Sequence, residues 1–247
     1  MILIRFVTIK KMFFIVLVLS CGFIFPAIAG ESVVLDSAPN RINDVAALQR
    51  GAKLFLKYCL NCHSASLMRY SRLKDLGFSE KKIKENMFFF TEKIDEPMTV
   101  AMQMSDAKDW FGSIPPDLSV QARVKGTDWL YTYLRAFYRD DSRSTGWNNV
   151  VFPNVGMPNP LWELQGQRAI KNQGKMNSNS MFIQLTPGIM KPGDFDNAVA
   201  DLVSYLDWMS EPVQRTRKKL GVWVLLFLAI FTLLAFRLNA AYWKDVK

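Results

Sequence analysis

Cys59-Leu60-Asn61-Cys62-His63 is the stretch of this 247-residue chain that decides what the rest of the fold must enclose. At the spacing Cys-x-x-Cys-His, two thiols can add to the vinyl groups of a haem while the next imidazole reaches the iron. His63 is also the only histidine in the sequence. The motif therefore predicts a covalently attached c-type haem with His63 as one axial ligand.

Two other kinds of site use closely spaced cysteines, and the sequence argues against both. A structural zinc site needs four nitrogen or sulfur ligands, and the one further cysteine, Cys21, lies in a segment that we expect to be removed. A thioredoxin-like dithiol opens a helix within a strand-helix-strand unit, and no run of alternating β-branched residues precedes Cys59. Haem attachment is the interpretation that uses the whole motif.

The N-terminus has the three parts of an export signal. Three basic residues lie within the first eleven positions, an apolar run follows, and Ala27-Ile28-Ala29 precedes Gly30. We predict that residues 1–29 are a signal peptide, cleaved after Ala29, and that Cys21 leaves with it. Export suits haem attachment, because that chemistry belongs to an oxidising compartment outside the cytoplasm.

A second apolar stretch lies near the C-terminus. Leu220 to Phe236 contains seventeen residues without a formal charge, which is long enough to cross a membrane. We predict a transmembrane helix over about 220–238, within a membrane anchor formed by residues 215–247. Basic residues flank the stretch on both sides, so charge bias does not orient it. The export signal does, and it predicts a short cytoplasmic tail.

The net charge of +9 and the pI near 9.5 raise the question of nucleic-acid binding. Residues 1–29 carry three basic side chains and residues 215–247 carry seven, whereas residues 30–214 carry 21 basic and 21 acidic side chains. The excess positive charge therefore flanks the two apolar segments. It predicts contact with lipid headgroups and no nucleic-acid partner.

Residues 30–214 suit one globular domain with a core of its own. Strand signals are sparse, and Pro, Gly, Asn and Trp concentrate in residues 109–116 and 146–160. Such segments are typical of long loops, here ordered around a large prosthetic group. We predict a mainly α fold, a cytochrome c-type haem domain with long ordered loops, followed by one C-terminal transmembrane helix.

Two amphipathic helices are expected in this domain. Asn43 and Asp44 can cap a helix that runs to about Tyr58 and delivers the haem motif. After a cap at Asp194, apolar residues at helical spacing predict a second helix leading toward the membrane. Gly51 would let these two helices cross closely.

The second axial position of the iron could be filled by methionine, lysine or water. A thioether stabilises ferrous iron and is the common choice in electron carriers. Met157 lies in Phe152-Pro153-Asn154-Val155-Gly156-Met157-Pro158, a stiff loop in which Gly156 would allow close approach to a flat ring. It could instead fill a gap in the core. Spacing alone also leaves other candidates, namely Met98, Met102, Met104 and Met190.

Haem propionates need counter-charges where they are partly buried, and the guanidinium of arginine suits them. Arg123 follows Pro115-Pro116-Asp117-Leu118-Ser119, which forms a rigid start to a helical segment. On the residues alone, Arg123 could equally be a solvated side chain, and the proline pair could be a simple turn.

Taken in order, these segments resemble the cytochrome c1 family, the haem subunit of the cytochrome bc1 complex (quinol:cytochrome c oxidoreductase). Cys-x-x-Cys-His alone is shared by every c-type cytochrome, but the ordered set with a C-terminal anchor is far more specific. The resemblance covers nearly all of the chain after residue 29. It is carried by Arg50-Gly51 and Phe55, the haem motif, Pro115 to Ser119 with Ala122-Arg123, Gly156-Met157-Pro158, Trp208, Glu211-Pro212, Arg217-Lys218-Lys219 and Gly221.

The resemblance implies one covalently attached haem c and a set of residues around it. Trp129 stands where the family often has a tyrosine near a propionate, and the extra cysteine pair of some relatives is absent. The implied roles are thioether bonds at Cys59 and Cys62, axial ligation by His63 and Met157, a propionate contact at Arg123, and packing at the haem edge by Pro115, Pro116 and Phe152.

The resemblance also implies an electron-transfer subunit of the respiratory bc1 complex, with no catalytic reaction of its own. Such a subunit takes electrons from the Rieske iron-sulfur protein, which draws them from quinol oxidised at cytochrome b. It passes them to a soluble or membrane-bound cytochrome c. The expected setting is a dimeric complex in the bacterial inner membrane, with a single-pass anchor and the haem domain in the periplasm.

Three alternatives are weighed against this function. The chain could be the haem subunit of a terminal oxidase or of a dehydrogenase, which the motif alone would fit. It could be a peroxidase-type enzyme with an open iron position, but the sequence offers no second histidine to act there. It could also be a structural subunit whose haem is vestigial.

Overall fold

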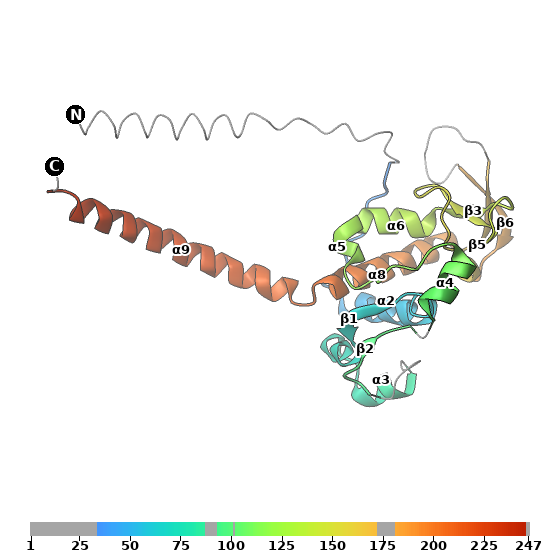
Figure 1. Ribbon diagram of the computed structural model, residues 1–247, viewed down its shortest axis with the longest axis horizontal. Helices are drawn as coiled ribbons and strands as arrows, with labels where there is room; N and C mark the ends of the chain where they lie inside the picture. Colours follow the sequence, from blue (N-terminus) through green and yellow to red (C-terminus); the bar gives the residue numbers. More distant parts are fainter. Residues whose placement is uncertain (1–33, 87–92, 101, 172–180, 246–247) are drawn as a thin grey trace. The chain divides into compact units, whose positions relative to one another are not determined.

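The computed structural model describes residues 34–86, 93–100, 102–171 and 181–245. The predicted signal peptide and Cys21 lie outside these residues. In chain order the elements are α2 (Val45–Tyr58), β1 (Ala65–Arg69), the 3-10 helix η1 (Tyr70–Leu76), α3 (Glu80–Asn86), β2 (Pro97–Met98), α4 (Met104–Phe111), α5 (Gln121–Lys125), α6 (Thr127–Arg135), β3 (Phe137–Arg139), β4 (Trp147–Asn149), α7 (Trp162–Gln165), β5 (Gly166–Ile170), β6 (Phe182–Pro187), α8 (Pro192–Ser210) and α9 (Gln214–Tyr242) (Figure 1).

Helix α2 forms as its sequence predicts. The Asp44 carboxylate caps it by accepting hydrogen bonds from the backbone N–H groups of Ala46 and Ala47, at 2.9 and 3.1 Å. The cap satisfies two donors that the first turn leaves without a helical partner. The face that includes Leu48 and Phe55 is buried. The helix ends at the haem motif, so its packing fixes where that motif lies.

Helix α8 begins earlier than predicted. Lys191 is its N-cap residue and Pro192 occupies its first turn, so the predicted cap at Asp194 is wrong. The proline ring fixes φ near the helical value and lacks the N–H that a first turn leaves unpaired, which makes Pro192 a favourable start. Asp194 lies in the first turn, where its charge interacts favourably with the helix dipole.

The core lies where α8 packs against α2 and α6, which lie beside it in Figure 1. At the crossing with α2, a Cβ atom on Gly51 would lie 2.1 Å from the backbone oxygen of Asp201. Only glycine, which lacks a Cβ atom, allows the two helices to approach this closely at position 51. The predicted close crossing at Gly51 is therefore confirmed. The Asp201 carboxylate, buried beside it, binds Arg41 at 2.7 Å and Arg50 at 2.6 Å.

The strands form three small antiparallel pairs, β1 with β2, β3 with β4, and β5 with β6. In the second pair, Phe137 lies opposite Asn149 and Arg139 lies opposite Trp147. This hairpin leads directly into the segment that carries Met157. The two segments predicted as loops are partly regular, because α4 extends into the first and β4 lies in the second.

Helix α9 contains the predicted transmembrane segment. Within it, Thr216–Tyr242 is long and apolar enough to cross a membrane. The most apolar stretch of these residues is not buried within the protein. A long helix without a packed face inside the protein suits a lipid environment, where backbone groups must bond within the helix. The architecture is thus a mainly helical domain with one C-terminal transmembrane helix, as the sequence predicts.

Candidate functional site

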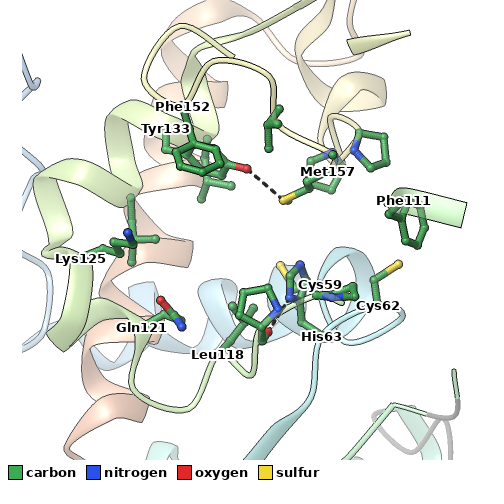
Figure 2. Close-up of a pocket in the computed structure, with 18 of the residues that line it drawn as sticks. Cys59, Cys62, His63, Phe111, Leu118, Gln121, Lys125, Tyr133, Phe152 and Met157 are labelled. Carbon is green, nitrogen blue, oxygen red and sulfur yellow. Dashed lines mark hydrogen bonds between the residues drawn. The ribbon is translucent and has the colours of Figure 1, made fainter. Parts of the chain in front are cut away.

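A cavity of about 360 Å³ lies between the end of α2 and the segment that follows β4 (Figure 2). Its volume falls in the usual range for a ligand site, and most of its lining is apolar. Seven of the eight predicted site residues line it: Cys59, Cys62, His63, Pro115, Pro116, Phe152 and Met157.

A tight turn after α2 holds the haem motif against this cavity. The backbone N–H of Cys62 donates to the carbonyl of Cys59 at 3.1 Å, and that of His63 donates to the same carbonyl at 2.9 Å. The turn brings both sulfur atoms and the imidazole to one wall of the cavity. Cys59 and Cys62 are free thiols.

The His63 imidazole is buried and oriented by one hydrogen bond. Its Nδ1 lies 2.8 Å from the carbonyl oxygen of Pro116. A carbonyl oxygen only accepts, so Nδ1 carries the proton and Nε2 keeps its lone pair. Burial lowers the pKa of His63, outweighing the hydrogen bond to Pro116, and favours the neutral ring. A neutral imidazole held by its other nitrogen is the usual state of a metal-ligating histidine.

The two thiols are unsuited to redox exchange. Burial, with a smaller contribution from Cys62, raises the pKa of Cys59 to about 12, and burial also raises the pKa of Cys62. A dithiol oxidoreductase needs a lowered pKa, because the thiolate is the attacking form. Cys59 is buried and Cys62 is half-buried, and neither has surroundings that lower the pKa of a thiol.

Met157 reaches the cavity from the opposite wall. Figure 2 shows its sulfur at the cavity, on the side opposite Cys59, Cys62 and His63. The sulfur accepts a hydrogen bond of 3.2 Å from the hydroxyl of Tyr133, a residue of α6. Burial raises the pKa of Tyr133, so this phenol stays protonated and remains a donor. Sequence reasoning brought Met157 to the site but missed Tyr133.

Two buried asparagines shape the segment that carries Met157. The Oδ1 atom of Asn149 accepts from the backbone N–H groups of Val151 and Phe152, at 2.9 and 3.2 Å. The Oδ1 atom of Asn148 accepts from the N–H of Asn154 at 2.8 Å. Asn154 adopts a left-handed conformation with φ of 63°, which asparagine tolerates better than most residues. Sequence reasoning used the asparagines of residues 146–160 only as a sign of loops and gave Asn148 and Asn149 no role at the site.

Gly156 packs closely against the end of α4. A Cβ atom at this position would lie 2.4 Å from the backbone oxygen of Phe111, at the end of α4. The absence of a side chain thus lets the methionine segment pack on a backbone carbonyl, and the close approach of Gly156 to a flat ring stays a prediction. The glycine still fixes where Met157 lies.

Arg123 is the predicted site residue that does not line the cavity. Its guanidinium binds the carboxylate of Glu211 at 3.1 Å, and Arg217 binds the same carboxylate. The hydrogen bond from Arg217, helped by the charges of Arg217 and Arg123, holds the pKa of Glu211 below its usual value. The polar side chains that line the cavity on this side are Gln121 and Lys125, with the Lys125 ammonium 5.2 Å from the ring centroid of Trp129.

The donor set fits a haem better than a metal ion held by protein alone. Among the residues described, no group of three or more His, Cys, Asp or Glu side chains could hold a metal ion. A neutral imidazole and a thioether across an apolar cavity are the axial ligands of low-spin haem iron. Two thiols lie beside the imidazole on the same wall of the cavity.

The Cytochrome C1 family model matches residues 37–246. The chain belongs to the cytochrome c1 family. The resemblance predicted from the ordered motifs is therefore confirmed, and haem binding and electron transport follow for the chain as properties of the family.

Several curated proteins are similar along most of their length. Cytochrome c1 of Allochromatium vinosum is 44% identical over 224 residues, covering 88% of this chain and 92% of that protein. A protein of Nitrosomonas europaea named ammonia monooxygenase gamma subunit is 44% identical over 218 residues, covering 88% and 91%. Cytochrome c1 of Rhodospirillum rubrum is 30% identical over 240 residues, covering 83% of each chain.

Proposed function

We propose that Cys59 and Cys62 hold one haem c through thioether bonds, and that His63 and Met157 bind its iron. The observation that carries this proposal is the placement of His63 and Met157 on opposite walls of one cavity, with both thiols beside the histidine (Figure 2). A bound haem c supplies a one-electron couple. His63 and Met157 position that couple inside an apolar enclosure.

Closed coordination determines what the chain can do. Because His63 and Met157 would occupy both axial positions, no position remains at the iron for a substrate. The chain then has no catalytic reaction of its own and serves as a redox subunit of quinol:cytochrome c oxidoreductase. Phe152 lines the cavity and is 51% exposed, so the cavity wall reaches the surface there. Electrons can enter or leave through that edge.

The proposed partners are those of a bc1 complex. The chain takes electrons from the Rieske iron-sulfur protein, works beside cytochrome b in a dimeric complex, and passes electrons to a soluble or membrane-bound cytochrome c. The predicted signal peptide and the apolar helix α9 support a single-pass protein of the bacterial inner membrane with the haem domain in the periplasm. The anchor raises the effective concentration of the haem domain near its partners.

Pro115, Pro116 and Phe152 line the cavity and would pack against the edge of a bound haem. A contact between Arg123 and a propionate requires the guanidinium to turn from Glu211 or to bind both carboxylates. Its proposed role can be tested with Arg123→Lys, which keeps the charge but loses the paired donors of the guanidinium.

Replacement of Met157 tests the function directly. In the full chain in membranes, Met157→Leu should keep covalently bound haem on a denaturing gel, lower the reduction potential and abolish quinol:cytochrome c turnover. Loss of the thioether removes the ligand that favours ferrous iron. Met104→Leu is the control, because Met104 is 71% exposed. An unchanged potential in Met157→Leu would show that another group is the ligand.

A second candidate function rests on the relative named ammonia monooxygenase gamma subunit. The chain would then serve as the haem subunit of a monooxygenase, and the same cavity would serve a different electron path. Affinity purification of the tagged full chain separates the two. Recovery with cytochrome b and a Rieske protein supports the bc1 assignment, whereas recovery with monooxygenase, oxidase or dehydrogenase subunits contradicts it.

A further inference from the structure

Tyr133 places a hydroxyl group against the sulfur of Met157 inside the cavity. The oxygen lies 3.2 Å from the sulfur, and the residue is 8% exposed (Figure 2). A hydroxyl in an apolar enclosure is unfavourable unless it has a hydrogen-bond partner. A phenylalanine would fill the same space without that cost, so the hydroxyl group itself needs an explanation.

The ring of Tyr133 is fixed from two sides. It stacks on Trp129 with centroids 4.8 Å apart and planes 11° apart, and it meets Phe137 edge-on at 5.1 Å. Such aromatic contacts restrict the ring to one orientation. The hydroxyl group therefore points at the sulfur because its own ring is held, and not because the sulfur attracts a mobile side chain.

Asn149, which shapes the segment that carries Met157, also connects that segment to Tyr133. The Nδ2 atom of Asn149 donates to the backbone carbonyl of Tyr133 at 2.8 Å, while its Oδ1 accepts from Val151 and Phe152. Asn149 is 1% exposed. One buried amide thus holds α6 and the segment leading to Met157 in register, which sets the distance between hydroxyl and sulfur.

We propose that Tyr133 is a positioning residue for the axial sulfur, holding Met157 toward His63 and raising the reduction potential of the site. This inference rests on the proposed function, in which Met157 binds the iron. A thioether sulfur has two lone pairs, so it can bind iron with one and accept from Tyr133 with the other. The hydrogen bond withdraws electron density from the sulfur, which disfavours ferric iron more than ferrous iron.

Tyr133→Phe in the full chain tests this role, because it removes only the hydroxyl group. The ratio of ferrous to ferric protein at a fixed potential should fall by roughly threefold to tenfold, the size expected for one hydrogen bond. A tenfold change corresponds to about 59 mV for a one-electron couple. Carbon monoxide should also displace the sulfur faster. Tyr131→Phe is the control, since Tyr131 is buried on the same helix but does not line the cavity.

A fluorotyrosine placed at position 133 gives a change of opposite sign. Its more acidic phenol donates a stronger hydrogen bond at nearly the same size, so the potential should rise above that of the natural chain. This variant decides the matter if Tyr133→Phe does not fold.

The outcomes separate the inference from the proposed function. If the natural chain shows the sulfur-to-iron charge-transfer band, and neither variant shifts the potential or the rate of sulfur displacement, Tyr133 has no positioning role while the function stands. If the natural chain lacks that band, Met157 is not the ligand, and both proposals are overturned. A shift of equal size in Tyr131→Phe would also overturn the inference.

Discussion

At the scale of single residues, the position of His63 depends on a carboxylate that never touches it. Asp117 accepts hydrogen bonds from the backbone N–H groups of Ser66 and Ser119, both at 2.8 Å. These bonds fix the segment in which the Pro116 carbonyl holds the imidazole. Asp117 thus sets the orientation of a proposed ligand through the chain, in the manner of residues that surround metal sites elsewhere.

Asp117→Asn should lower the free energy of unfolding of the domain, and the loss should be largest near neutral pH. Burial alone would raise the pKa of Asp117, but hydrogen bonds from Ser119 and Ser66 outweigh it and leave the pKa below its ordinary value of 3.8. A lowered folded pKa gives stability that is present above the ordinary value and is lost as pH falls through the folded pKa.

The expected loss at neutral pH is about 1 kcal/mol, because asparagine keeps one acceptor oxygen. Urea unfolding of the full chain at neutral pH and below about pH 4 measures the difference between the two proteins. The difference should shrink on the acid side. The control is Asp141→Asn, whose side chain is 93% exposed. A difference that stays constant with pH would show that the charge of Asp117 is not involved.

At the scale of elements, the crossing of α2 and α8 places the haem motif on the core. Gly51→Ala should destabilise the domain by about 3 kcal/mol, since overpacking outweighs the better helix propensity of alanine. The added Cβ would lie 2.1 Å from the Asp201 oxygen and 2.7 Å from the Tyr205 Cβ. Gly193→Ala in α8 is the control, because nothing lies within 4 Å of its added Cβ. Thermal unfolding of both variants gives the comparison, and equal melting temperatures would contradict this account of the crossing.

Elements that depend on contacts between residues close in sequence could be predicted, whereas those that depend on distant contacts could not. Asp44 caps its helix through residues two and three positions away, so the start of α2 could be predicted from local pattern. The same reasoning failed at Asp194, where Pro192 starts the helix instead. The pairing of Asn149 with Tyr133 and of Arg123 with Glu211 joins residues 16 and 88 positions apart. Periodicity and spacing in the sequence do not predict such contacts. These contacts nevertheless decide which side chains reach the cavity.

At the scale of the whole molecule, the core and the anchor are separate in their packing. The residues of the buried core lie between Ile42 and Met209, and the most apolar part of α9 has no buried residue. Truncation after Val213 should therefore yield a haem domain that stays in solution without detergent and keeps the absorption spectrum and potential of the full chain. Size-exclusion chromatography with a redox titration checks this. Aggregation or a changed potential would show that α9 contributes to the site.

Magnetic circular dichroism in the near infrared, applied to the assembled complex from native membranes, identifies the pair of axial ligands on the iron. We expect low-spin iron with one imidazole and one thioether sulfur in the natural chain. High-spin iron, a solvent ligand, or a second nitrogen such as the deprotonated amine of Lys125 would contradict the account.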